Sequence, residues 1–201
     1  GSVTENAAIY DASTQKVVVT YRDSNVSNNG YAVVGTIDAS DNSITFGTPV
    51  RFTTRNIEFS FLTYDQANSK VVIAYADSQG SRYGYAIVGA VSGTSISFGS
   101  ETVFNSYEVQ ECNIGYDANA QKVVIVYEDW GNNNVGTAIV GTVSGTSISF
   151  GTEVTFDSNR SRLMSVTYDE NAQKIVIAYI HNSGSIGKAI VGTVSGTSIS
   201  F

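Results

Sequence analysis

The chain has 201 residues, one cysteine and a formal net charge of −7, from 11 basic and 18 acidic residues. A single cysteine excludes an intramolecular disulfide framework. The acidic balance, without a local basic patch, argues against a nucleic-acid partner. The longest apolar runs, such as residues 174–180, fall far short of the roughly 20 residues that a membrane-spanning helix needs, so we expect no membrane partner either.

The chain repeats itself. The segment AIVGTVSGTSISF occurs at 138–150 and again at 189–201, and residues 86–98 differ from it at one position. A Tyr-Asp pair recurs with spacings of 54, 52 and 52, at Tyr10, Tyr64, Tyr116 and Tyr168. A period that covers the whole chain indicates a repeat architecture. We therefore divide one domain of residues 1–201 into repeats of about 3–52, 53–104, 105–156 and 157–201.

Each repeat predicts four extended segments. In the second repeat the first segment ends at Tyr64-Asp65, the second covers 70–77 and the third covers 85–91. The fourth begins at 95–98 and continues toward 101–104. The segment 70–77 is apolar on both faces and rich in β-branched residues, as is typical of a strand packed between two layers. No segment has helical periodicity. The sequence therefore predicts an all-β protein of four-stranded antiparallel sheets.

The expected turns fit this pattern. Gly93 is the first residue of a two-residue loop in SGTS at 92–95, where a type II′ turn requires a positive φ. The aspartate of each Tyr-Asp pair is placed to accept hydrogen bonds from the backbone that follows it, as in an Asx turn. These turns predict tight hairpins between the first and second strands and between the third and fourth.

A unit of about 52 residues is too small to hold a core alone, so its faces must pack against neighbouring units. Radial repetition achieves this, and we predict a four-bladed β-propeller closed within a monomer. The fourth repeat lacks the continuation that follows the phenylalanine in the other three. Three alternatives remain: residues 2–5 complete that blade, its outer strand is short, or the chain belongs to a longer array. Near-identical repeats also leave a domain-swapped dimer open.

The pattern KVVIAYxD, a Gly/Asn-rich loop and AIVGTVSGTSISF resembles the tandem β-propeller repeats of uncharacterised marine phage and bacterial proteins. The similarity spans nearly the whole chain. It implies the fold, and it carries no assigned activity. With it we expect a secreted or virion-associated protein.

The repeats differ mainly in two sets of loops. One set joins the second and third strands, at 23–30, 77–84, 129–136 and 181–187. The other set crosses to the next repeat, at 53–59, 105–111 and 157–163. Because consecutive antiparallel strands alternate in direction, both sets should emerge on one side, which we name the variable rim. Diversity there is consistent with a binding surface or with free drift of exposed loops.

Aromatic and cationic side chains of the variable rim are the candidate ligand-binding residues: Tyr83, Tyr107, Trp130, His181, Arg55, Arg82 and Arg160. Tyr83, Tyr107 and Trp130 belong to the junction of the second and third repeats, where they are expected to form a stacking platform beside Arg82. Aromatic faces with nearby hydrogen-bond donors suit a sugar. The alternative is that the tryptophan packs on a neighbouring loop.

Two carboxylates are candidate channel residues. Glu5 and Glu111 lie at equivalent positions of opposite repeats, so a closed ring would place them across the channel mouth. His181 is the only histidine and Cys112 is isolated, so we predict no metal centre of the His/Cys type and no cofactor.

No nucleophile elbow, phosphate-binding loop or metal-ligand spacing is found in the sequence. We therefore predict a non-enzymatic, glycan-directed binding module with a glycan or another cell-surface ligand as partner. The alternatives are a structural spacer without a small-molecule ligand and, third, a glycosidase that uses Glu5 and Glu111 as its carboxylate pair.

Overall fold

The structure, a computed structural model, describes residues 2–181 and 186–201 and is built of antiparallel strands with one short 3₁₀ helix. Unit 1 contains β1 (Val3–Asp11), β2 (Lys16–Asp23), β3 (Asn29–Asp38), β4 (Ser43–Phe46) and β5 (Val50–Thr53). Unit 2 repeats the pattern with β6 (Ile57–Asp65), β7 (Lys70–Asp77), β8 (Gly84–Ser92), β9 (Ser95–Phe98) and β10 (Thr102–Asn105). The prediction of an all-β antiparallel protein is confirmed.

Units 3 and 4 share a strand. Unit 3 contains β11 (Val109–Asp117), β12 (Lys122–Asp129), the 3₁₀ helix η1 (Trp130–Asn132), β13 (Val135–Ser144) and β14 (Ser147–Phe150). The long strand β15 (Val154–Asp169) pairs with β13 through its first part and with the next strand through its second part. Unit 4 is completed by β16 (Lys174–His181), β17 (Ile186–Ser195) and β18 (Ser198–Ser200). The shared strand joins the two units into one eight-stranded sheet.

The turns form for the local reasons that the sequence predicts. Asp11 Oδ1 accepts hydrogen bonds from the backbone N–H of Ser13 at 2.9 Å and of Thr14 at 3.2 Å. Gly93 has a φ of +60° in the hairpin between β8 and β9, a conformation that glycine adopts without a steric penalty. Contacts within a few residues of each turn therefore favour the hairpin register of each unit.

The apolar core is divided into three clusters, one at each junction between successive units. Every unit has two apolar faces. We name one the Val/Ala face, built on the register pairs Val18↔Val34, Val72↔Val88, Val124↔Val140 and Val176↔Val191. We name the other the Ile/Tyr face, built on Val19↔Val33, Ile73↔Ile87, Ile125↔Ile139 and Ile177↔Ile190 together with the tyrosines Tyr21, Tyr75, Tyr127 and Tyr179.

At each junction the Val/Ala face of one unit packs on the Ile/Tyr face of the next. Val18 and Val34 of unit 1 share a cluster with Ile73 and Tyr75 of unit 2, and the other two clusters repeat this pairing. The middle strands β7 and β12 are buried on both faces. Burial between units therefore supplies the core that no unit holds alone.

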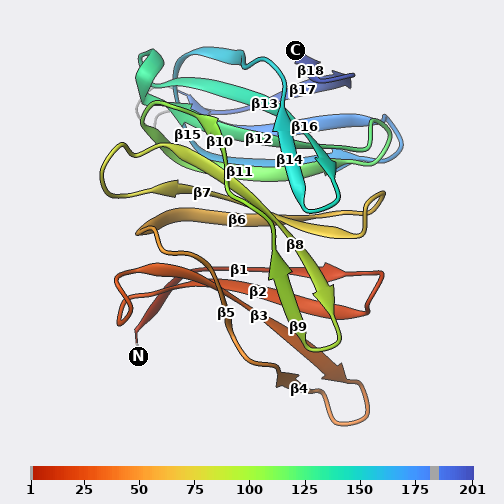
Figure 1. Cartoon of the computed structure of the whole chain (residues 1–201). Coiled ribbons are helices and arrows are strands. Elements are labelled where there is room, and N and C mark those ends of the chain that lie inside the picture. Colours follow the sequence, from red (N-terminus) through yellow and green to blue (C-terminus); the bar gives the residue numbers. More distant parts are fainter. Residues whose placement is uncertain (1, 182–185) are drawn as a thin grey trace.

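The expected closed ring is not present among the described residues. The inner strands pack in chain order, β1 along β6, β6 along β11 and β11 along β15, whereas β1 and β15 do not pack along each other. Figure 1 shows the four units stacked in this order, with the two termini at opposite ends of the stack. Residues 3–11 form β1 and pair with β2, so they do not complete unit 4, whose last described strand is β18.

Candidate functional site

Hydrogen bonds gather the variable loops and the crossovers at one end of the strands. Ile57 N donates to Asn28 O at 3.1 Å, which ties the first crossover to the loop between β2 and β3. Val109 N donates to Arg82 O at 2.9 Å and Ser161 N to Asn134 O at 3.3 Å, which repeats this link in the next two units. The variable rim is therefore one continuous edge. Residues 182–185 of the fourth loop lie outside the described residues.

Two exposed aromatic side chains lie at the junction of units 2 and 3. Tyr107 is 65% exposed and Trp130 is 40% exposed. In the crossover, the backbone N–H of Tyr107 donates to Asn105 Oδ1 at 2.6 Å. Trp130 N donates to Glu108 O at 3.0 Å, and Gly131 lies directly against the Tyr107 side chain. We name Tyr107 and Trp130 the aromatic platform.

Two guanidinium groups are held near the residues of the aromatic platform. Arg82 Nη1 is 3.0 Å from Glu108 Oε1, and Glu108 also accepts the backbone bond from Trp130. The Arg160 guanidinium lies 5.8 Å from the centre of the Trp130 ring, within the range of a cation–π contact. Arg160 Nε is 2.6 Å from Oε1 of Glu128, whose side chain is fully buried. These carboxylates fix the two cations beside the platform.

The remaining ligand-binding candidates lie elsewhere on the variable rim. Tyr83 is half-buried and packs on the cluster between units 1 and 2, so it does not extend the platform as expected. Arg55 lies 3.9 Å over the Tyr85 ring and forms ion pairs with Asp77 at 3.2 Å and Glu101 at 3.1 Å. Burial by itself lowers the pKa of Arg55, but these two carboxylates raise it above its ordinary value. Arg55 and both carboxylates line a polar recess of about 470 Å³.

His181 is paired with an aspartate rather than exposed for a ligand. Its Nδ1 lies 2.5 Å from Asp157 Oδ2, and both side chains are largely buried. Burial raises the pKa of Tyr179 to about 12, and the nearby Asp157 carboxylate adds to this effect. Asp157 lies in the crossover into unit 4 and also accepts a hydrogen bond from Asn159 N at 2.9 Å. The pairing of His181 with Asp157 therefore stabilises this crossover.

The two channel carboxylates do not form a facing pair. Glu5 Oε2 accepts a hydrogen bond from Phe59 N at 3.1 Å. Glu111 Oε2 accepts one from Leu163 N, and its other oxygen is 3.3 Å from Arg162 Nε. All four equivalent positions, Glu5, Phe59, Glu111 and Leu163, have a positive φ and lie at a register shift of an inner strand. Each glutamate thus joins its own bulge to that of the next unit, which corrects the expectation of a pair across a channel.

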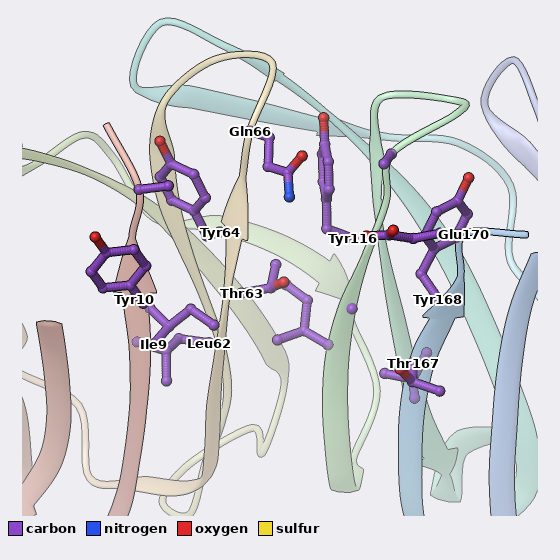
Figure 2. A pocket seen from close by; sticks show the side chains of 15 residues that line it. Ile9, Tyr10, Leu62, Thr63, Tyr64, Gln66, Tyr116, Thr167, Tyr168 and Glu170 are labelled. Carbon is purple, nitrogen blue, oxygen red and sulfur yellow. The ribbon is translucent and has the colours of Figure 1, made fainter. Parts of the chain in front are cut away.

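A second groove lies on the opposite side, at the hairpins that follow the Tyr-Asp pairs, and we name this side the Tyr-Asp rim. This groove has a volume of about 460 Å³ and is lined by the ends of all four inner strands. Figure 2 shows the tyrosines in a row along it, with Gln66 and Glu170 at the same edge. The row consists of Tyr10, Tyr64, Tyr116 and Tyr168.

Three of these tyrosines have a structural partner in the preceding unit. The hydroxyl groups of Tyr64, Tyr116 and Tyr168 accept hydrogen bonds, each at 3.2 Å, from the backbone N–H of Ser13, Ala67 and Asn119. Sequence reasoning used these tyrosines only to set the repeat register and missed the groove. Their recurrence at one end of four equivalent strands was the signal that could have found it.

Cys112 is the free thiol of the described residues. They contain no group of three or more His, Cys, Asp or Glu side chains placed to hold a metal ion. Burial raises the pKa of the Cys112 thiol, which donates to Phe59 O at 2.9 Å and is 1% exposed. No helix within the described ranges is long and apolar enough to cross a bilayer.

No protein-family model and no curated protein matches the chain. Among solved structures, the chain is similar to an exo-β-1,3-galactanase from Phanerochaete chrysosporium, crystallised with β-1,3-galactotriose. The TM-score is 0.58 at 9% sequence identity, and the match covers 98% of this chain and 48% of the galactanase chain. The chain thus spans about half the length of that protein, and the similarity concerns the fold alone.

Proposed function

We propose that this protein is a non-enzymatic, glycan-directed binding module whose four units are the blades of an open propeller. The observation that carries the proposal is the aromatic platform, in which Tyr107 and Trp130 remain 65% and 40% exposed at one junction of the variable rim. Exposed aromatic faces stack on the apolar faces of sugar rings. The flanking Arg82 and Arg160 supply hydrogen-bond donors in fixed positions.

The flanking ion pairs support a prearranged site. Glu108 and Glu128 hold the two guanidinium groups before any ligand arrives, so less side-chain freedom is lost on binding. Arginine also has five N–H donors, which leaves some of them free to bind sugar hydroxyl groups. The galactanase with a similar fold was solved with a galactotriose, and this favours β-1,3-galacto-oligosaccharides as the first probes.

A glycan array followed by calorimetric titration tests the proposal. We expect Trp130→Ala and Tyr107→Ala each to weaken binding of the best array ligand by about tenfold or more, which corresponds to about 1.4 kcal/mol. The matched variant is Tyr10→Ala, which removes a 53% exposed aromatic side chain from the Tyr-Asp rim. It should bind as the parent does, and thermal unfolding should show that all three variants are folded.

The groove of the Tyr-Asp rim is the competing location, because it is lined from all four units. If Tyr10→Ala abolishes binding and Trp130→Ala does not, the ligand occupies the groove and the platform assignment is wrong. No binding to any glycan by the parent would favour the structural spacer.

The glycosidase alternative makes a separate prediction. It requires turnover of a glycoside that Glu111→Gln abolishes. We expect no turnover, because Glu111 is already engaged by Leu163 N and Arg162 and because Glu5 bonds to a different unit.

A further inference from the structure

The three junctions between units repeat one pairing of faces. In each, the Val/Ala face of one unit is covered by the Ile/Tyr face of the unit that follows it. Burial at these junctions is nearly complete: Val72, Val88, Val124 and Val140 are each 0% exposed. The tyrosines on the covering faces are equally enclosed, with Tyr75 and Tyr127 both at 0%.

The two ends of the stack leave one half of this pairing uncovered at each end. Unit 4 ends on its Val/Ala face, where Val191 is 55% exposed and the neighbouring Ala178 and Ala189 are exposed as well. Unit 1 begins with its Ile/Tyr face, where Ile44 is 42% exposed and Phe46 is 48% exposed. The equivalents of Ile44 in the other units, Ile96, Ile148 and Ile199, are 3–5% exposed.

We propose that the Val/Ala face of unit 4 docks on the Ile/Tyr face of unit 1 of a second copy of this chain. The occupant is specified by the molecule itself, because the two free faces are the two partners that pack together at every internal junction. Unit 3 and unit 4 are identical over the thirteen residues 138–150 and 189–201, so the part of the free face on β17 has the same apolar side chains as the part of unit 3 that is buried. Such a contact is head-to-tail and either closes into a ring or continues into a longer stack.

The stacked tyrosines of unit 1 indicate how the faces would meet. Tyr21 and Tyr31 have ring centroids 5.9 Å apart, as do Tyr75 and Tyr85 in unit 2. The unit 2 pair is covered by unit 1, whereas the unit 1 pair is only half-buried. The end face of unit 1 thus already has the conformation of a covered face and needs little rearrangement to bind.

The free face of unit 4 lacks one contact that the internal junctions have. This missing contact lowers the affinity that we expect between two copies. A phenylalanine on the outer strand of each preceding unit packs on the next tyrosine, as in Phe52–Tyr75 at 5.5 Å and Phe156–Tyr179 at 5.1 Å between ring centroids. Residues 157–201 include no phenylalanine equivalent to Phe52 or Phe156. We therefore expect association to be weaker than the packing within the chain and to depend on concentration.

Charge gives a second signature. Each copy has a net charge of −7, so two copies repel one another and salt screens this repulsion. Association through apolar faces should therefore strengthen as salt is raised. An ionic contact would weaken under the same conditions.

Sedimentation velocity over a range of protein concentrations, roughly 1 to 500 μM, tests the proposal. The parent should shift from one-chain species to species of two or more chains, and more so at high salt. Val191→Glu blocks the unit 4 face and Ile44→Glu blocks the unit 1 face. Each variant alone should remain a monomer, because only one competent face is left.

An equimolar mixture of the two variants is the decisive sample. Each retains the face that the other lacks, so the mixture should form a two-chain species that cannot grow further. The control is Val103→Glu, which replaces a 43% exposed valine on β10, away from both end faces, and it should associate as the parent does. Both blocked positions are exposed, and thermal unfolding of dilute samples should show that the variants fold.

Three results would overturn the proposal. The first is a parent that stays monomeric at every concentration and salt level, which would leave these faces to some other occupant. The second is self-association of either blocked variant as strong as that of the parent, because like faces would then be pairing. The third is a mixture that contains only monomers although the parent associates. A chain extended after Phe201 by a copy of residues 151–156 would supply the missing phenylalanine and should associate more tightly than the parent.

Discussion

Residues 138–150 and 189–201 have the same thirteen amino acids and adopt the same hairpin of two strands. Their burial differs most on the Val/Ala face. Val140 is 0% exposed and its equivalent Val191 is 55% exposed. On the other face, Val143 and Val194 are 6% and 8% exposed.

This comparison separates the conformation that a segment adopts by itself from the burial that neighbouring units provide. The hairpin forms in both places because the strand residues and the Ser-Gly-Thr-Ser turn are local. Burial of the Val/Ala face depends on whether another unit follows. The same contrast distinguishes the interior junctions from the two ends of the stack, and three measurements can break or sharpen it.

The largest expected effect is at an interior ion pair. Glu128 is fully buried on the Val/Ala face of unit 3, and Arg160 Nε lies 2.6 Å from it. Arg160→Ala removes the counter-charge of a buried carboxylate, which should reduce the free energy of unfolding by about 3 kcal/mol. The matched variant Arg82→Ala breaks a pair whose side chains are 37% and 29% exposed, and it should cost less than about 1 kcal/mol.

Urea unfolding at neutral pH measures both ion-pair variants. Glu128→Gln in the Arg160→Ala background should recover part of the loss, because it removes the uncompensated charge. Equal losses for Arg160→Ala and Arg82→Ala would show that burial of Glu128 does not set the strength of its pairing.

The next effect uses the identical segments directly. Val140→Ala removes buried methyl groups between units 3 and 4 and should reduce the free energy of unfolding by about 2 kcal/mol. Val191→Ala makes the same chemical change at the free end and should cost less than about 0.5 kcal/mol. Denaturant titrations of dilute protein, below the concentration at which copies associate, should show this difference. Similar losses at the two positions would mean that Val191 is covered even in a single copy.

The smallest effects concern pH. Burial raises the pKa of Asp157, but bonds from Asn159 N and His181 outweigh this and leave the pKa below its ordinary value. Asp157 therefore contributes stability that is complete above the ordinary pKa of about 3.9 and is lost as the pH falls through the lowered value. Asp129 is the opposite case: burial raises its pKa, so its contribution is present at low pH and is lost as the pH rises through the raised value.

Thermal unfolding between about pH 2 and 7 should separate the two aspartates. Asp157→Asn should flatten the loss of stability at acidic pH, and Asp129→Asn should increase stability at neutral pH relative to acidic pH. The assignment fails if both variants change the pH profile in the same direction.

Much of the fold could be predicted from the sequence. The recurring Tyr-Asp pairs indicated the four units and their alignment with one another. Asp11 and Gly93 predicted their turns because a side-chain hydrogen bond or a positive φ determines the backbone within a few residues. The location of the variable loops at one end of the strands also follows from antiparallel pairing, and the bond between Val109 N and Arg82 O agrees with it. Of the predicted platform, Tyr107, Trp130 and Arg82 lie at one junction, whereas Tyr83 is half-buried and packs against the cluster between units 1 and 2.

The remaining features could not be predicted from the sequence, for physical reasons. Closure of a ring depends on the angle between neighbouring units, and small differences in side-chain packing at three junctions accumulate in that angle. The partners of Glu5 and Glu111 depended on the same geometry. The carboxylates bond to the next unit in chain order, to Phe59 N and Leu163 N, rather than meeting across a channel.

The sequence by itself determined the strands, the hairpins and the two apolar faces of every unit, because these depend on residue types a few positions apart. Only the tertiary structure decided which of those faces are covered and that the stack remains open. The alternation of side chains gives each unit a Val/Ala face and an Ile/Tyr face, but burial requires a second surface at contact distance. Whether that surface is present depends on the arrangement of the whole chain.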